Sequence, residues 1–275
     1  MLLNTPQKQF SLTFRNPIWQ IRPDFEQEIL ALELRDGDRL QTEFVVLDAK
    51  TGLAQEPYQA SENWWVGLED TGWGILFLHG FADRKVGSHA GLTAVNINPQ
   101  QVLWQHEQAV FYGLAVDFKI LAQPNHTEKE AFIALDAQTG TVLETAIPWE
   151  QAYNAVTTFA QARQKLGLYP VHHTAGSAYF DLLSQFIFSR TGRQVVGAID
   201  YLEVSNFLIF SYYEAMLAGK MKNILGIYSA EEGSLITEEI INASVAGLGT
   251  DSFLVMKNTL LFIVEKQTLV AYKLK

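Results

Sequence analysis

Two near-identical stretches decide the fold: residues 44–52 (FVVLDAKTG) and residues 132–140 (FIALDAQTG). Each begins with an apolar run that is typical of a buried strand and ends in Asp-Ala-x-Thr-Gly. An Asp at this position can accept hydrogen bonds from the backbone two residues further on. The Thr-Gly pair adds a hydroxyl group and a residue that tolerates a positive φ. The motif therefore predicts a turn between two strands, and not a catalytic group.

Weaker copies of the motif occur at residues 92–104, 225–233 and 262–269, so the pattern is a repeat. The residues at the Asp position are Asp48, Asn96, Asp136, Ser229 and Glu265. Most copies are about 36 to 48 residues apart, and one interval is about twice as long, as expected for strand-built repeats. We predict an all-β fold, a β-propeller of about six or seven blades, that forms one domain over residues 1–275.

One segment departs from the strand pattern and predicts an inserted α-helix over residues 148–167. Pro148 lies at the position of a first turn, Glu150 follows it, and Gly167 is placed to end the helix. The apolar stretch at residues 180–188 and those after it predict further strands. We expect the last strand, residues 269–274, to pair near the first one, because this closes a propeller without an exposed edge.

Composition excludes several classes of protein. The chain has 275 residues with Lys+Arg 20 against Asp+Glu 30, a net charge of −10, which argues against nucleic acid or an anionic membrane as partner. It contains no Cys, so disulfides and thiolate chemistry are excluded. No apolar run reaches the roughly 18 residues of a spanning helix, and no signal peptide is evident. We expect a cytoplasmic protein, unless a leader has been removed.

The pattern Ala-Leu-Asp-Ala-x-Thr-Gly-x-Val-Leu, carried by residues 134–143, resembles the repeat of quinoprotein-type (PQQ-like) β-propellers. The whole chain also resembles bacterial propellers of a family of unknown function. The resemblance implies a propeller, which in many such proteins is a non-catalytic scaffold. Quinoprotein enzymes are usually exported, have eight blades and often carry a vicinal disulfide beside the cofactor. This chain lacks these features, so we expect no bound quinone and no other cofactor.

The densest polar cluster follows the predicted helix and contains His172, His173, Tyr179 and Asp181. Two adjacent His residues in a strand point to opposite faces of the sheet, but in a loop both could bind one ion, with Asp181 as a third ligand. Such a site would suit zinc or iron. The alternative, which the sequence favours, is a hydrogen-bonded loop at the rim of the channel. The other four His residues are dispersed: His79, His89, His106 and His126.

Aromatic residues form the second candidate site. Trp64, Trp65 and Trp73 lie near acidic residues and could form a shelf for a glycan or a peptide, but the sequence favours packing in the core or between blades. No nucleophile motif or phosphate-binding loop is present, so no catalytic residue is predicted. The sequence favours a non-catalytic binding or scaffolding module with an unknown protein or small-molecule partner. The alternatives are a metal-assisted enzyme that uses His172, His173 and Asp181, and a glycan-binding protein.

Overall fold

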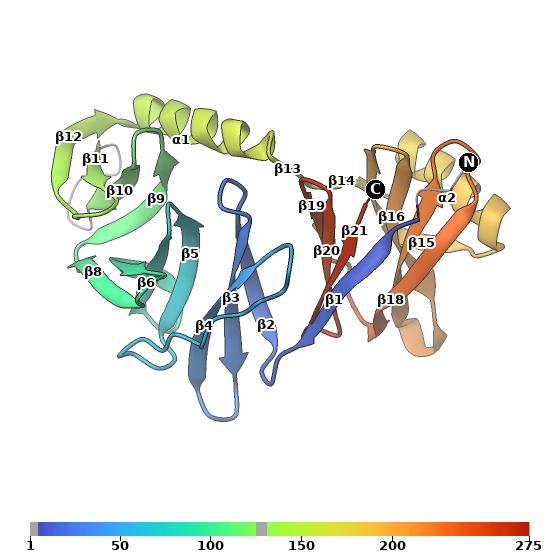
Figure 1. Ribbon diagram of the computed structural model, residues 1–275, viewed down its shortest axis with the longest axis horizontal. Coiled ribbons are helices and arrows are strands. Elements are labelled where there is room, and N and C mark those ends of the chain that lie inside the picture. Colours follow the sequence, from blue (N-terminus) through green and yellow to red (C-terminus); the bar gives the residue numbers. More distant parts are fainter. Residues whose placement is uncertain (1–4, 125–130, 275) are drawn as a thin grey trace. The chain divides into compact units, whose positions relative to one another are not determined.

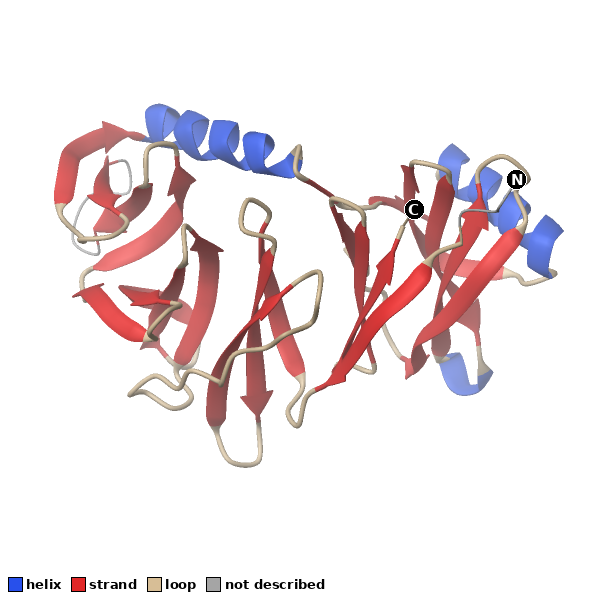
Figure 2. Ribbon diagram, viewed as in Figure 1, coloured by secondary structure: helices blue, strands red, loops and turns tan. Residues whose placement is uncertain are grey.

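The computed structural model describes residues 5–124 and 131–274. Within these residues the chain is all-β, with five separate antiparallel sheets and two α-helices (Figures 1 and 2). It folds into two compact units. One unit contains residues 16–49 and 53–166, and is called the three-sheet unit here. The other contains residues 1–15, 50–52 and 167–275, and is called the two-sheet unit.

The three-sheet unit is built from successive hairpins. Its sheets have the strand orders β2-β3-β4, β5-β6-β7-β8 and β12-β11-β10-β9. The elements are β2 (Ile18–Asp24), β3 (Ile29–Asp36), β4 (Gln41–Asp48), β5 (Val66–Gly72), β6 (Ile75–Asp83), β7 (Ser88–Asn96), β8 (Gln101–His106), β9 (Ala109–Ala115), β10 (Lys119–Pro124), β11 (Ala131–Asp136), β12 (Val142–Pro148) and α1 (Trp149–Gln164). Because each strand pairs with its neighbour in the chain, every sheet is a meander.

Apolar side chains between neighbouring sheets form the core of this unit. Phe44 and Leu68 belong to a cluster between the first and second sheets, and Phe77 and Leu114 belong to one between the second and third. Helix α1 packs on the third sheet, where Val156 lies over the bare backbone of Gly113. A Cβ atom at Gly113 would come within 2.4 Å of Val156 Cγ1, so the close approach of helix and strand requires glycine there.

The two-sheet unit has the strand orders β1-β21-β20-β19-β13 and β14-β15-β16-β17-β18. Its elements are β1 (Gln7–Thr13), β13 (Gly167–Leu168), β14 (Val171–Thr174), α2 (Ala178–Thr191), β15 (Val195–Val204), β16 (Phe207–Ala215), the short 3-10 helix η1 (Leu217–Gly219), β17 (Met221–Ser229), β18 (Leu235–Val245), β19 (Phe253–Met256), β20 (Thr259–Val264) and β21 (Thr268–Lys273). The first and last strands, β1 and β21, pair with each other, which confirms the expected pairing of the terminal strands.

The repeated turns have the predicted hydrogen bonds. Oδ1 of Asp136 accepts from the backbone N–H groups of Gln138 and Thr139 at 3.0 and 2.8 Å. Gly140 has a φ of 69°, in the left-handed region that the turn requires. In a weaker copy, Asn96 Oδ1 accepts from the backbone N–H of Asn98 at 2.8 Å. The prediction that the motif is a turn between strands is confirmed.

The inserted helix is also confirmed, since α1 spans Trp149–Gln164 inside the predicted range. The strand predicted at residues 180–188 is wrong, because this segment lies within helix α2. Ser177 caps the helix by accepting a hydrogen bond from the Phe180 N–H, and Gly192 ends it with a φ of 71°. Phe180, Leu183 and Ile187 are buried at helical spacing.

The described residues form five sheets, fewer than the six or seven blades that the repeat predicted. The difference arises because residues 149–191 supply two helices and only the short edge strands β13 and β14, where another blade was expected. None of the five sheets closes on itself, and the propeller ring stays a prediction. The single domain over residues 1–275 also stays a prediction.

Candidate functional site

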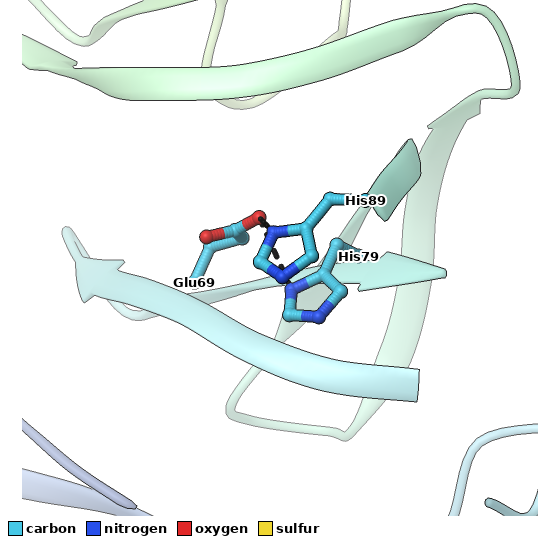
Figure 3. Close-up of side chains that lie close together, drawn as sticks. All are labelled: Glu69, His79 and His89. Atoms are coloured by element: carbon cyan, nitrogen blue, oxygen red, sulfur yellow. Dashed lines mark hydrogen bonds and ion pairs between the residues drawn. The ribbon is translucent and has the colours of Figure 1, made fainter. Parts of the chain in front are cut away.

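Three strands of the second sheet bring Glu69, His79 and His89 together. Glu69 lies on β5 at a bulge, His79 on β6, and His89 on β7 (Figure 3). His89 pairs with Phe81, two residues after His79, so the two imidazoles are diagonal neighbours across the hairpin. The bulge inserts an extra residue between Leu68 and Asp70 and lets the Glu69 carboxylate reach both rings.

One carboxylate oxygen faces both imidazoles. Glu69 Oε1 lies 2.8 Å from His89 Nδ1 and 3.1 Å from His79 Nδ1. The two rings are stacked, with centroids 3.5 Å apart and planes 10° apart. His89 is exposed, whereas His79 is only 6% exposed, and its buried Nδ1 has no hydrogen-bond partner of suitable geometry. This nitrogen is close to the carboxylate but not satisfied by it.

The His79 ring rests on the bare backbone of β5. A Cβ atom at Gly67, the residue paired with His79, would come within 2.5 Å of the ring carbon Cε1. The ring of Phe81 packs against the same imidazole in a T-shaped arrangement, with centroids 5.0 Å apart and planes 73° apart. Glycine at position 67 and the aromatic ring of Phe81 therefore fix the position of His79.

A pocket of about 290 Å³ adjoins the cluster, and Arg22, Glu33 and Arg35 contribute to its wall. Arg22 Nε donates to the backbone carbonyl of Glu69 at 2.7 Å. Arg35 Nε donates to Glu33 Oε1 at 2.5 Å, and Glu33 Oε2 accepts from the backbone N–H of Leu68 at 2.7 Å. The charge of Arg35 is thus balanced by the buried Glu33 carboxylate beside the site.

Opposing effects act on the carboxyl group of Glu69. Burial on its own raises the pKa of Glu69, but the two imidazoles beside its carboxylate, His79 by its charge and His89 by its charge and its hydrogen bond, together outweigh it. The net pKa of Glu69 lies below its usual value of 4.5.

A lowered carboxyl pKa makes stability depend on pH. Because the pKa of Glu69 is lower in the folded than in the unfolded state, its contribution is present above the unfolded value and lost as the pH falls through the folded value. We expect acidification from about pH 6 to about pH 3 to destabilise the wild type more than Glu69→Gln. Urea midpoints from tryptophan fluorescence measure this, with the exposed Glu144→Gln as a charge-matched control. Equal acid sensitivity in Glu69→Gln and the wild type would contradict the prediction.

A larger pocket of about 820 Å³ lies at the repeat turns of the same unit. Its wall includes Asp48 at the end of β4, Asn96 and Asn98 at the end of β7, and Gln138 and Thr139 after β11. The β5–β6 turn adds Trp73 and Gly74, and the polar side chains of Gln27 and Gln55 complete the rim. The repeat turns that follow β4, β7 and β11, one from each sheet, therefore line the same pocket.

The structure places the predicted His cluster on two elements. His172 and His173 are neighbours on β14, an arrangement in which side chains alternate between faces, and Asp181 lies in the first turn of α2. The carboxylate that contacts His172 is that of Asp200, whose Oδ1 lies 2.7 Å from His172 Nδ1, while His173 stacks on Tyr179. Within residues 5–124 and 131–274, the group with ligand atoms close enough to share an ion is Glu69, His79 and His89, and not the predicted one.

Asp200 gives His172 a structural partner. The buried Asp200 carboxylate also accepts hydrogen bonds from the Ser252 backbone N–H at 3.0 Å and from the Ser252 hydroxyl at 2.6 Å. The contact therefore joins β14 and β15 to the segment before β19. The predicted loop at the rim of a channel is not what the structure has at these positions, because His172 and His173 lie on a strand, β14.

The three predicted tryptophans do not form one shelf. Trp64 and Trp65 precede β5 and Trp73 follows it, so they are separated by the length of the strand, roughly 25 Å at 3.3 Å per residue. Arg35 covers the Trp64 ring and Arg84 covers the Trp65 ring. Trp73 packs on Phe118 and Phe159 and also lines the larger pocket. Only Trp73 therefore contributes to that pocket.

Two of the four dispersed His residues form the cluster that sequence reasoning missed. His106 instead bonds to the carbonyl of Gly140, and His126 lies outside the described residues. The sequence contains one signal for this cluster, the hairpin turn that begins at Asp83. The Asp83 carboxylate accepts a hydrogen bond from the Lys85 N–H at 2.7 Å. Residues on either side of such a turn face each other, but the register and the bulge at Glu69 have to be known before the partners can be matched.

Part of the chain matches a known protein family. Residues 24–104 match a family described as a domain of unknown function (DUF4905), and this segment contains Glu69, His79 and His89. No curated protein matches the chain. In the described part of the chain, neither helix has the length and apolar character needed to cross a membrane.

Proposed function

We propose that the chain is a non-catalytic binding module whose 820 Å³ pocket binds an uncharged ligand rich in hydroxyl groups, such as a saccharide. The observation that carries this proposal is the convergence of the repeat turns of three sheets on one pocket. Loops held by a rigid scaffold are where binding residues concentrate.

The lining of this pocket favours binding over catalysis. Among its lining residues, Asp48 is the one titratable group, and the other polar side chains are amides and the Thr139 hydroxyl. General acid–base catalysis needs a pair of titratable groups near the reacting atoms, and nucleophilic catalysis needs an activated nucleophile. This lining supplies neither.

The same lining selects the chemical class of the ligand. Amide side chains both donate and accept hydrogen bonds, as hydroxyl groups do. Gln55 and Asn98 are already linked at 3.0 Å across the rim, which holds the two amides in place. The lining includes no Lys or Arg to attract an anion, and Trp73 supplies an aromatic surface.

We also propose the more specific fold and location that the sequence predicts. The chain is then a quinoprotein-like propeller in the cytoplasm of a bacterium. The support for this proposal is that the sheets follow one another as antiparallel meanders and that the terminal strands share a sheet. The repeated Asx turns add to this support.

NMR titration with neutral disaccharides tests the proposed function. We expect a disaccharide such as cellobiose or chitobiose to shift the side-chain amide signals of Asn98 and Gln138, and the matched sugar phosphate to bind more weakly. Gln138→Ala removes one hydrogen-bonding group and should weaken binding up to about tenfold. Gln105→Ala, on the exposed face of β8, is the control and should bind as the wild type does. Shifts that avoid the pocket, or no shifts with any sugar, would contradict the proposal.

A further inference from the structure

We propose that Glu69, His79 and His89 form a binding site for a divalent transition-metal ion, with Zn²⁺ as the best-matched ion. The site lies beside the smaller pocket and is separate from the pocket of the proposed function. Success or failure of either proposal therefore leaves the other unaffected.

The donor set indicates the class of metal. Two imidazole nitrogens and one carboxylate oxygen suit zinc and neighbouring first-row ions, whereas Mg²⁺ and Ca²⁺ take oxygen ligands. Three protein ligands also leave a coordination position open, as in zinc sites that bind water or an exogenous ligand.

The distances fit a shared ion. The three ligand atoms all lie within 4.8 Å of one another, and Glu69 Oε1 is 2.8 and 3.1 Å from the two Nδ1 atoms. Ligand atoms about 2.0 Å from a tetrahedral ion are about 3.3 Å apart, so small movements are enough. Because the rings are stacked, one must turn to direct its lone pair at the ion, and His89, 40% exposed at its side chain, has the room to do so.

The buried nitrogen of His79 supports a metal site independently of the distances. Its side chain is 7% exposed, it points into the cluster, and its Nδ1 has no hydrogen-bond partner. Leaving such an atom unsatisfied costs free energy, and buried polar atoms are nearly always paired. A bound metal ion would satisfy it.

The surrounding charges fit an anionic fourth ligand. The negative charge of Glu69 offsets part of the charge of the ion, and Arg35 is neutralised by Glu33. Arg22, held by the Glu69 carbonyl, adds a positive charge to the wall of the adjoining pocket. We therefore expect the open position to take hydroxide or a carboxylate more readily than a neutral ligand.

Calorimetric titration of the chelator-treated full chain with ZnCl₂ tests the site. We expect one ion per chain, with binding weakened by roughly 100-fold in His89→Gln and Glu69→Gln, since even loss of a supporting group costs 10- to 100-fold. His89 is exposed, so its variant should fold, and circular dichroism checks this. His106→Gln and His172→Gln are controls and should bind as the wild type does.

Co²⁺ provides a second readout that a purely structural role would not produce. With CoCl₂, the wild type should develop the visible absorption of a low-symmetry cobalt site, and His89→Gln should not. The proposal is overturned if the wild type does not bind zinc, or if His89→Gln and Glu69→Gln bind it unchanged. It is also overturned if His172→Gln abolishes binding, because the ion would then lie at the site predicted from the sequence.

Discussion

Glu33→Ala is expected to lower the free energy of unfolding of the three-sheet unit by about 3 kcal/mol, as for other broken buried ion pairs. Glu33 is 1% exposed and joins two sheets, because it lies on β3 and accepts from the Leu68 N–H on β5 at 2.7 Å. Its other oxygen accepts from Arg35, whose side chain is 13% exposed. Truncation leaves the buried Leu68 N–H and the Nε–H of Arg35 without their acceptor, and Arg35 keeps only the carbonyls of Trp64 and Val66.

Two controls separate the causes of that loss. Glu33→Gln keeps the shape and an acceptor for Leu68, so it should cost less than Glu33→Ala. In the double variant Glu33→Ala/Arg35→Met no guanidinium is left without its carboxylate, and part of the stability should return. Urea unfolding followed by tryptophan fluorescence suits this test, because all six Trp residues lie in the three-sheet unit. A loss below about 1 kcal/mol for Glu33→Ala would contradict the account.

Arg163→Met should also destabilise the three-sheet unit by about 3 kcal/mol, since it removes one partner from a largely buried network. Arg163 lies near the end of α1 and binds three acceptors. Its guanidinium is 3.1 Å from Asp70 Oδ2, and it donates to the carbonyls of Pro23 and Thr71 at 2.8 and 2.9 Å. Arg163 thus ties the helix to β2 and to β5.

Asp70 determines how the controls should behave. Burial raises the pKa of Asp70, and the charge of Arg163 offsets only part of this effect. Asp70→Asn removes a carboxylate whose charged form burial disfavours, so it should cost less than Arg163→Met. Lys165→Met removes the same charge from an exposed position two residues away and should change stability by less than about 0.5 kcal/mol. Equal unfolding midpoints for Arg163→Met and Lys165→Met would show that the network does not hold the helix.

The repeat turns and the inserted helix could be predicted because their signals are local. The Asp136 turn needs only its own carboxylate and a glycine at position 140, and α1 follows from residues between Pro148 and Gly167. Helix α2 was missed although Ser177 and Gly192 mark its ends. The sequence of α2 is largely apolar, so its hydrophobicity differs little from one face of the helix to the other. Without a clear apolar stripe at helical spacing, the segment resembles a buried strand.

The Glu69–His79–His89 cluster could not be predicted because it depends on register. The adjacent residues His172 and His173 drew attention in the sequence, yet neighbours on a strand face apart. His79 and His89 are ten positions apart in the sequence, and the β6–β7 pairing makes them neighbours. Glu69 reaches them only because β5 has a bulge at that residue, and nothing in the local sequence marks this irregularity.

A crystal structure of the chain soaked with the disaccharide that gives the largest NMR shifts is the most direct test of the binding function. The account predicts electron density for the sugar between the turns of Asp48, Asn98 and Gln138, with hydrogen bonds to their side chains. A sugar bound elsewhere, with this pocket holding only water, would contradict it.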